Sequence, residues 1–227
     1  MLMDSQPDYI KQLEALPPKL KEAWLYGRWD IFEGQFFEDF RDTPDPAKAA
    51  EEDCTVEDLK RQRRWTHVIE PFDIPSGWTV CRSYDFGYNK PFSCAWWAVD
   101  YDGRAYLYRQ LYGCTDSPNT GLRWQPCDIA KKIRQIEDAC EKGHKIVGIA
   151  DPSIWDASRG EAIIEAANRN GIFFNKGDNK RLPGWMQVHY RLHFDNDGIP
   201  MMYVFNTCKG FIRTLPELKF SNTNPED

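Results

Sequence analysis

Two aspartates, Asp85 and Asp151, are the residues of this sequence best placed to do chemistry together. Each ends an apolar run, over residues 78–84 and 145–150, and a glycine or a proline follows soon after. Both runs therefore read as strands that end at an acid. Side chains at the carboxyl ends of strands lie where open α/β sheets bind ligands.

The chemistry that such a pair predicts is the binding of a hard divalent cation. Neighbouring strands lie about 4.7–4.9 Å apart, so both carboxylates could reach one ion at about 2.0–2.1 Å. Without a cation, two carboxylates about 4 Å apart repel by roughly 4 kcal/mol at an effective dielectric constant of 20. The alternative is structural, because an aspartate at the end of a strand often caps the turn that follows it.

The composition indicates a folded protein that does not span a membrane. Of the 227 residues, 41% are hydrophobic and 14% are aromatic, yet no run of apolar residues approaches 18. The first residues lack the basic and apolar regions of a signal peptide. The seven cysteines form an odd set without a C-x-x-C pair, which predicts reduced thiols in an intracellular protein.

The charge gives weak evidence about nucleic acid. A net charge of −6 argues mildly against a nucleic-acid binder, although bound cations would offset it. Basic residues cluster at 60–64, 131–134 and 176–181, and a solvated helix face explains each cluster as well. Within the last cluster, Lys180 and Arg181 are candidates for a DNA phosphate contact, with simple exposure as the equal alternative.

The order of the predicted elements indicates the fold class. Strands are expected at 78–86, 92–100, 104–112, 145–150 and 172–174, and helices at 126–142, 159–170 and 184–194. An Asp-Gly pair at 102–103 predicts a β-hairpin between the second and third strands. We therefore predict an α/β fold with a mixed sheet of about five strands flanked by helices. The order matches a ribonuclease H-like core, in which the first and fourth strands are adjacent and each carries an acid.

The remaining predictions concern the residues before the main body and those near its end. Residues 9–26 predict a helix that a proline pair breaks, and residues 41–66 form a charged insertion with a short helix from about 56 to 64. The main body begins near residue 67. Residues 193–206 predict a second hairpin, which turns at an Asp-Asn-Asp-Gly sequence.

Other polar residues have weaker claims on a site. His189 and His193 are spaced i, i+4, but a tyrosine stands where H-E-x-x-H needs a glutamate, so a solvated helix face is expected. Three further acids are expected to be solvated in turns and loops: Asp100, Asp102 and Asp156. Of the adjacent tryptophans 96 and 97, one is expected in the core and the other against a helix or the linker.

The quoted residues resemble the C-terminal nuclease domain of the large terminase subunit of tailed bacteriophages. Tyr84-Asp-Phe-Gly87 is similar to the first catalytic motif of that family, and Ala150-Asp-Pro-Ser153 to the second. Tyr26-Gly-Arg-Trp-Asp30 resembles the segment that links the packaging ATPase to the nuclease. Each motif is short, and their common order and spacing make the resemblance specific.

The resemblance implies an endonuclease that cuts double-stranded concatemeric viral DNA with two divalent cations, Mg²⁺ or Mn²⁺. Asp85 would be the first ligand and would bridge both ions, and Asp151 would be the second. The family's third acid is expected beyond residue 227, and no Walker A pattern occurs. Residues 1–40 would be the linker from the ATPase domain, and 67–227 the C-terminally truncated nuclease domain. The implied partners are that ATPase domain, the small terminase subunit and the portal, in the cytoplasm of the bacterial host.

Two other functions fit the same residues. A resolvase or transposase core of the ribonuclease H-like type would share Asp85 and Asp151 but not the aromatic linker. A non-catalytic module that docks on a portal or motor partner would carry the two acids as vestiges.

Overall fold

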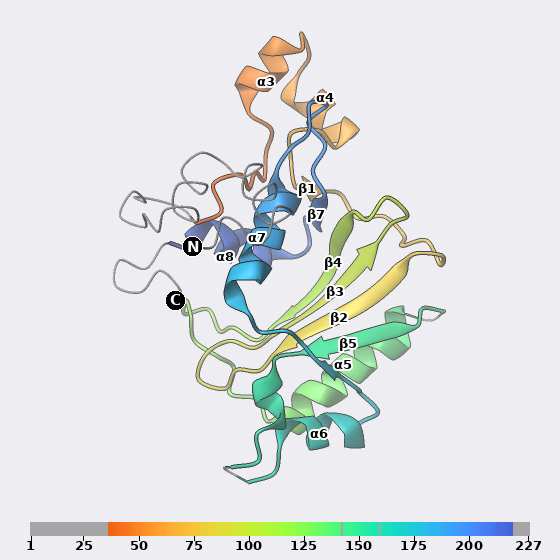
Figure 1. The fold of residues 1–227 in the computed structure, drawn as a ribbon, viewed down its shortest axis with the longest axis vertical. Helices are drawn as coiled ribbons and strands as arrows, with labels where there is room; N and C mark the ends of the chain where they lie inside the picture. The colour runs from red at the N-terminus through yellow and green to blue at the C-terminus, as the bar shows by residue number, and fades with distance from the viewer. Residues whose placement is uncertain (1–35, 142, 159, 220–227) are drawn as a thin grey trace, which may run out of the picture.

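A twisted seven-stranded mixed sheet forms the centre of the molecule, in the order β1-β7-β4-β3-β2-β5-β6. The computed structural model describes residues 36–141, 143–158 and 160–219, and Figure 1 shows how its elements are arranged. The strands are β1 (Val68–Ile69), β2 (Thr79–Asp85), β3 (Ser93–Val99), β4 (Ala105–Tyr112), β5 (Ile146–Ala150), β6 (Asn175–Lys176) and β7 (Met202–Phe205). The helices are α3 (Pro46–Glu51), α4 (Val56–Gln62), α5 (Pro126–Cys140), α6 (Ile163–Arg169), α7 (Arg181–Leu192) and α8 (Lys209–Thr214), with the 3₁₀ turns η3 (Pro152–Trp155) and η4 (Leu215–Glu217).

The strand pairing confirms the predicted ribonuclease H-like α/β fold. Strands β2, β3 and β4 form an antiparallel meander, and β5 pairs parallel with β2, so the first and fourth predicted strands are adjacent. The sheet exceeds the five predicted strands because β7 joins it parallel to β4, and β1 pairs parallel with β7. The two-residue β1 is too short to show the alternation that marks a strand in a sequence.

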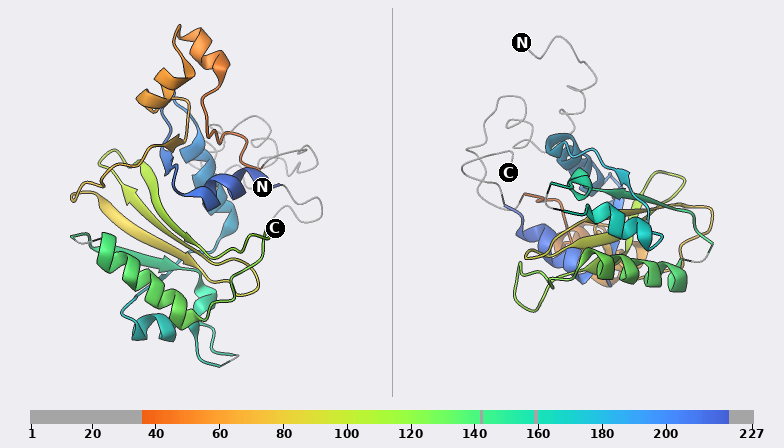
Figure 2. Two further views of the ribbon diagram at one scale, coloured as in Figure 1. Left: turned by 180° about the vertical axis from the view of Figure 1, so that it is seen from behind. Right: turned by 90° about the horizontal axis from the view of Figure 1, so that it is seen from below.

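Helices lie on both faces of the sheet. The view in Figure 1 places α7 in front of the sheet, and the view from behind in Figure 2 places α5 in front. Ile129, Ala130 and Ile133 of α5 are buried, as the apolar period of residues 126–142 predicts. Trp96 is fully buried in the core, and Trp97 packs edge-on against Phe211 of α8 at 6.0 Å, which confirms the expected division between them.

Two predicted strands differ from the structure. The strand expected at 172–174 lies instead at β6, because the carbonyl oxygen of Phe173 accepts a hydrogen bond from the side chain of Arg82 rather than from a strand. The hairpin expected over 193–206 is reduced to a single antiparallel bridge between Phe194 and Pro200. Its second half is β7, whose partners β4 and β1 both run parallel to it.

Residues 41–66 form two short helices that project from one end of the sheet (Figure 1). Asp45 caps α3, since its side chain accepts a hydrogen bond from the amide of Ala47. Thr55 and Asp58 form a capping box at the start of α4. These caps explain why so charged a segment is helical. The linker helix expected over 9–26 lies outside the described residues, and within them no helix is long and apolar enough to cross a membrane.

Candidate active site

The sheet brings Asp85 and Asp151 side by side at the carboxyl ends of two adjacent strands. The parallel register of β2 and β5 ends with Tyr84 opposite Ala150, and the amide of Asp151 donates a hydrogen bond to the carbonyl of Tyr84 at 3.1 Å. Asp85, the last residue of β2, and Asp151, the first residue after β5, therefore follow this last pair on neighbouring strands. On β2, the buried Arg82 and Tyr84 alternate with exposed residues, so Asp85 points to the face opposite α5.

Both aspartates line one hollow of about 600 Å³ at the carboxyl ends of β2, β5 and β6. Its floor comes from the strands and its rim from the turns that follow them. The lining residues are Ser83, Tyr84, Asp85, Ser93, Ile149, Ala150, Asp151, Pro152, Gly177, Asp178, Asn179 and Arg181. This is the position at which open α/β sheets bind ligands.

The two carboxylates are close enough to influence each other electrostatically. Partial burial in the hollow raises the pKa of Asp85, and the negative charge of Asp151 raises this pKa further. Such repulsion is what a divalent cation between the two side chains would relieve. The structural alternative also applies to Asp151, because its Oδ1 accepts a hydrogen bond from the amide of Ser153 at 2.8 Å and caps η3. That cap fixes the carboxylate and leaves Oδ2 for a ligand.

The donor set fits a hard cation as a pair of carboxylates. Among the described residues, no group of three or more His, Cys, Asp or Glu side chains could hold a metal ion. Asp85 and Asp151 are the two carboxylates that adjacent strands bring together here, and Mg²⁺ is commonly held by one or two carboxylates.

Sequence reasoning gave no role in the site to Asp178 or Asn179, which also line the hollow. They follow β6 as the aspartates follow β2 and β5, but β6 has only two residues and gave no pattern from which to find them. The carboxylate of Asp178 accepts a hydrogen bond from the amide of Lys180 and lies 3.5 Å from the Nζ of the same residue.

The structure separates the two basic candidates. Arg181 was expected in a loop, but it is the first residue of α7 and lines the hollow. Lys180 is the N-cap residue of α7, is not among the lining residues, and forms an ion pair with Asp178. Arg181 is thus the basic residue that the fold brings to the aspartates.

Histidine 189 was predicted wrongly as part of a solvated helix face. Its side chain is buried, with 2% of the residue exposed, and its ring packs against Phe36 and Phe37 at 5.3 and 4.8 Å. His193 is exposed as expected. The i, i+4 spacing could not show this difference because residues far away in the sequence cover one histidine and not the other.

The three acids that were expected in turns and loops, Asp100, Asp102 and Asp156, do not line the hollow. Asp100 holds the β3–β4 turn, since its side chain accepts hydrogen bonds from the amides of Asp102 and Arg104 and from the hydroxyl of Tyr106. Asp156 accepts hydrogen bonds from Ser158 in the loop after η3. Asp102 and Asp156 are exposed as expected, whereas only 10% of the Asp100 side chain is exposed, so Asp100 is held within its turn rather than solvated.

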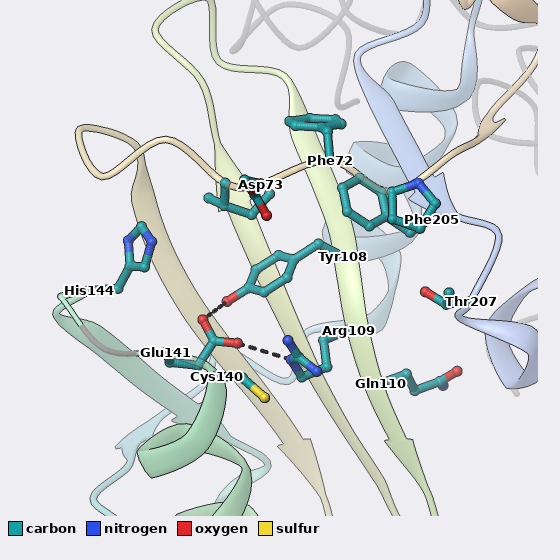
Figure 3. A pocket seen from close by; sticks show the side chains of 12 residues that line it. Phe72, Asp73, Tyr108, Arg109, Gln110, Cys140, Glu141, His144, Phe205 and Thr207 are labelled. Atoms are coloured by element: carbon teal, nitrogen blue, oxygen red, sulfur yellow. Dashed lines mark hydrogen bonds and ion pairs between the residues drawn. The ribbon is translucent and has the colours of Figure 1, made fainter.

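A second hollow, of about 570 Å³, lies beside the end of α5 (Figure 3). It contains neither aspartate of the pair. Its acid Glu141 is buried, and the two carboxylate oxygens accept hydrogen bonds from the hydroxyl of Tyr108 at 3.0 Å and from Nε of Arg109 at 2.9 Å. Since both oxygens are engaged, this hollow is a weaker candidate for metal chemistry than the aspartate pair.

Comparison with solved structures finds large terminases. The large terminase of a thermophilic bacteriophage, in complex with ADP, matches 96% of this chain, with a TM-score of 0.63 and 19% sequence identity. A second structure of the same phage protein matches 93% of this chain, with a TM-score of 0.60 and 21% identity. This chain spans less than half of theirs, 44% and 47% respectively. The nuclease domain of the P22 large terminase also matches, but its TM-score of 0.47 is too low to carry weight.

The chain therefore has the fold of a large terminase over most of its length, as the resemblance implied. At such identities the similarity establishes the fold and leaves activity to be argued from the site. No family model matches the sequence, and no curated protein does.

Proposed function

We propose that this chain is the nuclease domain of a phage DNA-packaging terminase large subunit, a metal-dependent endonuclease that cuts double-stranded DNA. The observation that supports this most is the placement of Asp85 and Asp151, side by side at the ends of adjacent parallel strands and open to one hollow. The large-terminase fold gives that pair a context in DNA packaging.

In the proposed mechanism, Asp85 and Asp151 would hold two divalent cations, Mg²⁺ or Mn²⁺. Such ions supply an activated water and a counter-charge for the leaving oxygen of a phosphodiester. The amide of Ser153 fixes the Asp151 carboxylate, so its free oxygen is preorganised toward the ligand. Arg181 lines the same hollow and is suited to orient the scissile phosphate through its planar guanidinium.

The test is cleavage by the purified chain on linear duplex, supercoiled plasmid and four-way junction DNA, with Mn²⁺ or with EDTA. We expect Mn²⁺-dependent nicking and linearisation of plasmid and no preference for junctions. A strong junction preference would favour a resolvase. The docking alternative would gain support if the chain failed to cut DNA and no manganese density lay between Asp85 and Asp151 in soaked crystals.

The two basic candidates should differ in a DNA-binding assay. Arg181→Ala should weaken duplex binding about tenfold, the effect of losing one charge-assisted contact. Lys180→Ala should change it little, since Lys180 pairs with Asp178 outside the hollow lining. Fluorescence anisotropy with Ca²⁺ in place of Mn²⁺ measures both, and equal effects would contradict the assignment.

In the packaging motor, the ATPase domain, small subunit and portal remain the proposed partners.

A further inference from the structure

Arg82 is a buried cation on β2 that the proposed mechanism does not use. It precedes Asp85 by three residues, and only 3% of it is exposed. Its guanidinium forms an ion pair with Glu137 of α5, donates a hydrogen bond to the carbonyl of Phe173 at 2.9 Å, and lies 4.5 Å from the ring of Phe174. A single side chain thus joins β2, α5 and the segment that leads to β6.

Neighbouring residues support these contacts of Arg82. Trp96 donates its indole N–H to the same oxygen of Glu137 at 2.9 Å, so the carboxylate is held where the guanidinium meets it. Gly148 stands opposite Arg82 on β5. A Cβ atom there would lie 2.2 Å from the carbonyl oxygen of Phe173 and 2.7 Å from the guanidinium. Only glycine leaves room for the Phe173 backbone to cross β5 this closely.

The segment that Arg82 holds runs directly into the candidate active site. Strand β6 has only two residues, which pair with β5 alone, and Gly177 follows with a hydrogen bond from its amide to the carbonyl of Ala150 at 2.8 Å. The ring of Phe174 also stacks on Tyr84 at 5.2 Å. So short an edge strand has little intrinsic stability, and its position depends on these anchors.

We propose that Arg82 is a positioning residue, which holds residues 173–181 against β5 and so places Arg181 beside the aspartate pair. This inference rests on the proposed function, because Arg181 is the group that contacts DNA there. Its guanidinium fork suits the task, since it satisfies a carboxylate, a carbonyl and an aromatic face at once, which a lysine cannot do.

Hydrogen exchange of the full chain tests directly whether Arg82 keeps residues 173–181 against β5. In Arg82→Met, amides of residues 175–181, Gly177 among them, should exchange about tenfold faster, because local opening costs less. Arg82→Lys should give an intermediate rate. Arg109→Met is the matched control, since it also breaks an arginine–glutamate contact at the end of α5 (Figure 3) but touches no residue of this segment. Equal acceleration in Arg109→Met would overturn the proposal.

A double-mutant cycle on duplex binding, measured with Ca²⁺ in place of Mn²⁺, tests the consequence. Arg82→Met should weaken binding about fivefold in the wild-type background and hardly at all in Arg181→Ala, because both act through one contact. Additive effects would overturn the inference and leave the proposed function standing, whereas no binding by the wild type would overturn both. Should Arg82→Met not fold, Phe174→Leu removes the ring contacts with both Arg82 and Tyr84 and keeps the ion pair, with the same two expectations.

Discussion

Asp85→Asn is expected to reduce Mn²⁺-dependent DNA cleavage at least about a thousandfold, and Asp151→Asn is expected to do the same. Each change removes one anionic oxygen ligand of the aspartate pair that adjacent strands place in the hollow. Asparagine is a better substitute than alanine, because at position 151 its amide oxygen can still accept the hydrogen bond that the amide of Ser153 donates. Plasmid nicking measured at several Mn²⁺ concentrations checks the prediction.

The same variants give a stability signature that separates loss of ligand from loss of fold. Since burial and Asp151 raise the pKa of Asp85 above its ordinary value, its charged form destabilises the native state at neutral pH. Asp85→Asn should therefore leave the thermal midpoint unchanged or raise it when no metal is present. Calorimetry with Mn²⁺ should show weaker binding for both variants than for the wild type.

Asp102→Asn is a suitable control for cleavage, since Asp102 lies in the β3–β4 turn away from the hollow. It should cut DNA like the wild type. Undiminished cleavage by both Asp85→Asn and Asp151→Asn would refute the proposed site, whereas a fall in the thermal midpoint of Asp85→Asn would attribute lost activity to misfolding.

The sequence predicted the aspartate pair because a strand of five or more residues leaves a recognisable apolar run in the sequence. β2 and β5 each carry an apolar run that stops at an acid, and the mixed order of elements predicted that these two strands would be neighbours. These conclusions needed only local periodicity and a chain order typical of one fold.

The remainder of the site depends on contacts that no local pattern encodes. Strand β6 is held by the Arg82 side chain and by pairing to β5, so its two residues carry no signal. The start of α7 was placed at 184 rather than 181, directly after Pro183, although proline is tolerated in the first turn of a helix. Arg181 was consequently assigned to a loop.

The second large effect expected is a loss of stability in acid that comes from two buried histidines. Burial lowers the pKa of His67 to about 4, and burial also lowers the pKa of His189 to about 4. Both values lie below the ordinary 6.5 of the unfolded chain. The unfolded state therefore binds more protons between pH 6.5 and 4, and stability falls as the pH falls through this range. Each histidine should cost about 3 kcal/mol by pH 4.

The surroundings explain why neither ring accepts a proton while the chain is folded. Nδ1 of His67 accepts a hydrogen bond from the amide of Arg41 at 2.9 Å, and Nε2 lies 2.8 Å from the carbonyl of Leu192, which it serves as donor. The neutral ring is thus fully satisfied, and a second proton would face the amide. Among the described residues, Nε2 of His189 has no hydrogen-bond partner at all.

Urea unfolding of His189→Leu, compared with the wild type between pH 7 and 4.5, isolates one of these contributions. Leucine fills a similar volume in the aromatic surroundings and removes both the titration and the unpartnered nitrogen, so the variant should equal or exceed the wild type at pH 7. Its advantage should grow by about 2 kcal/mol toward pH 4.5. A difference between His189→Leu and wild type that does not change with pH would show that His189 does not resist protonation in the folded protein.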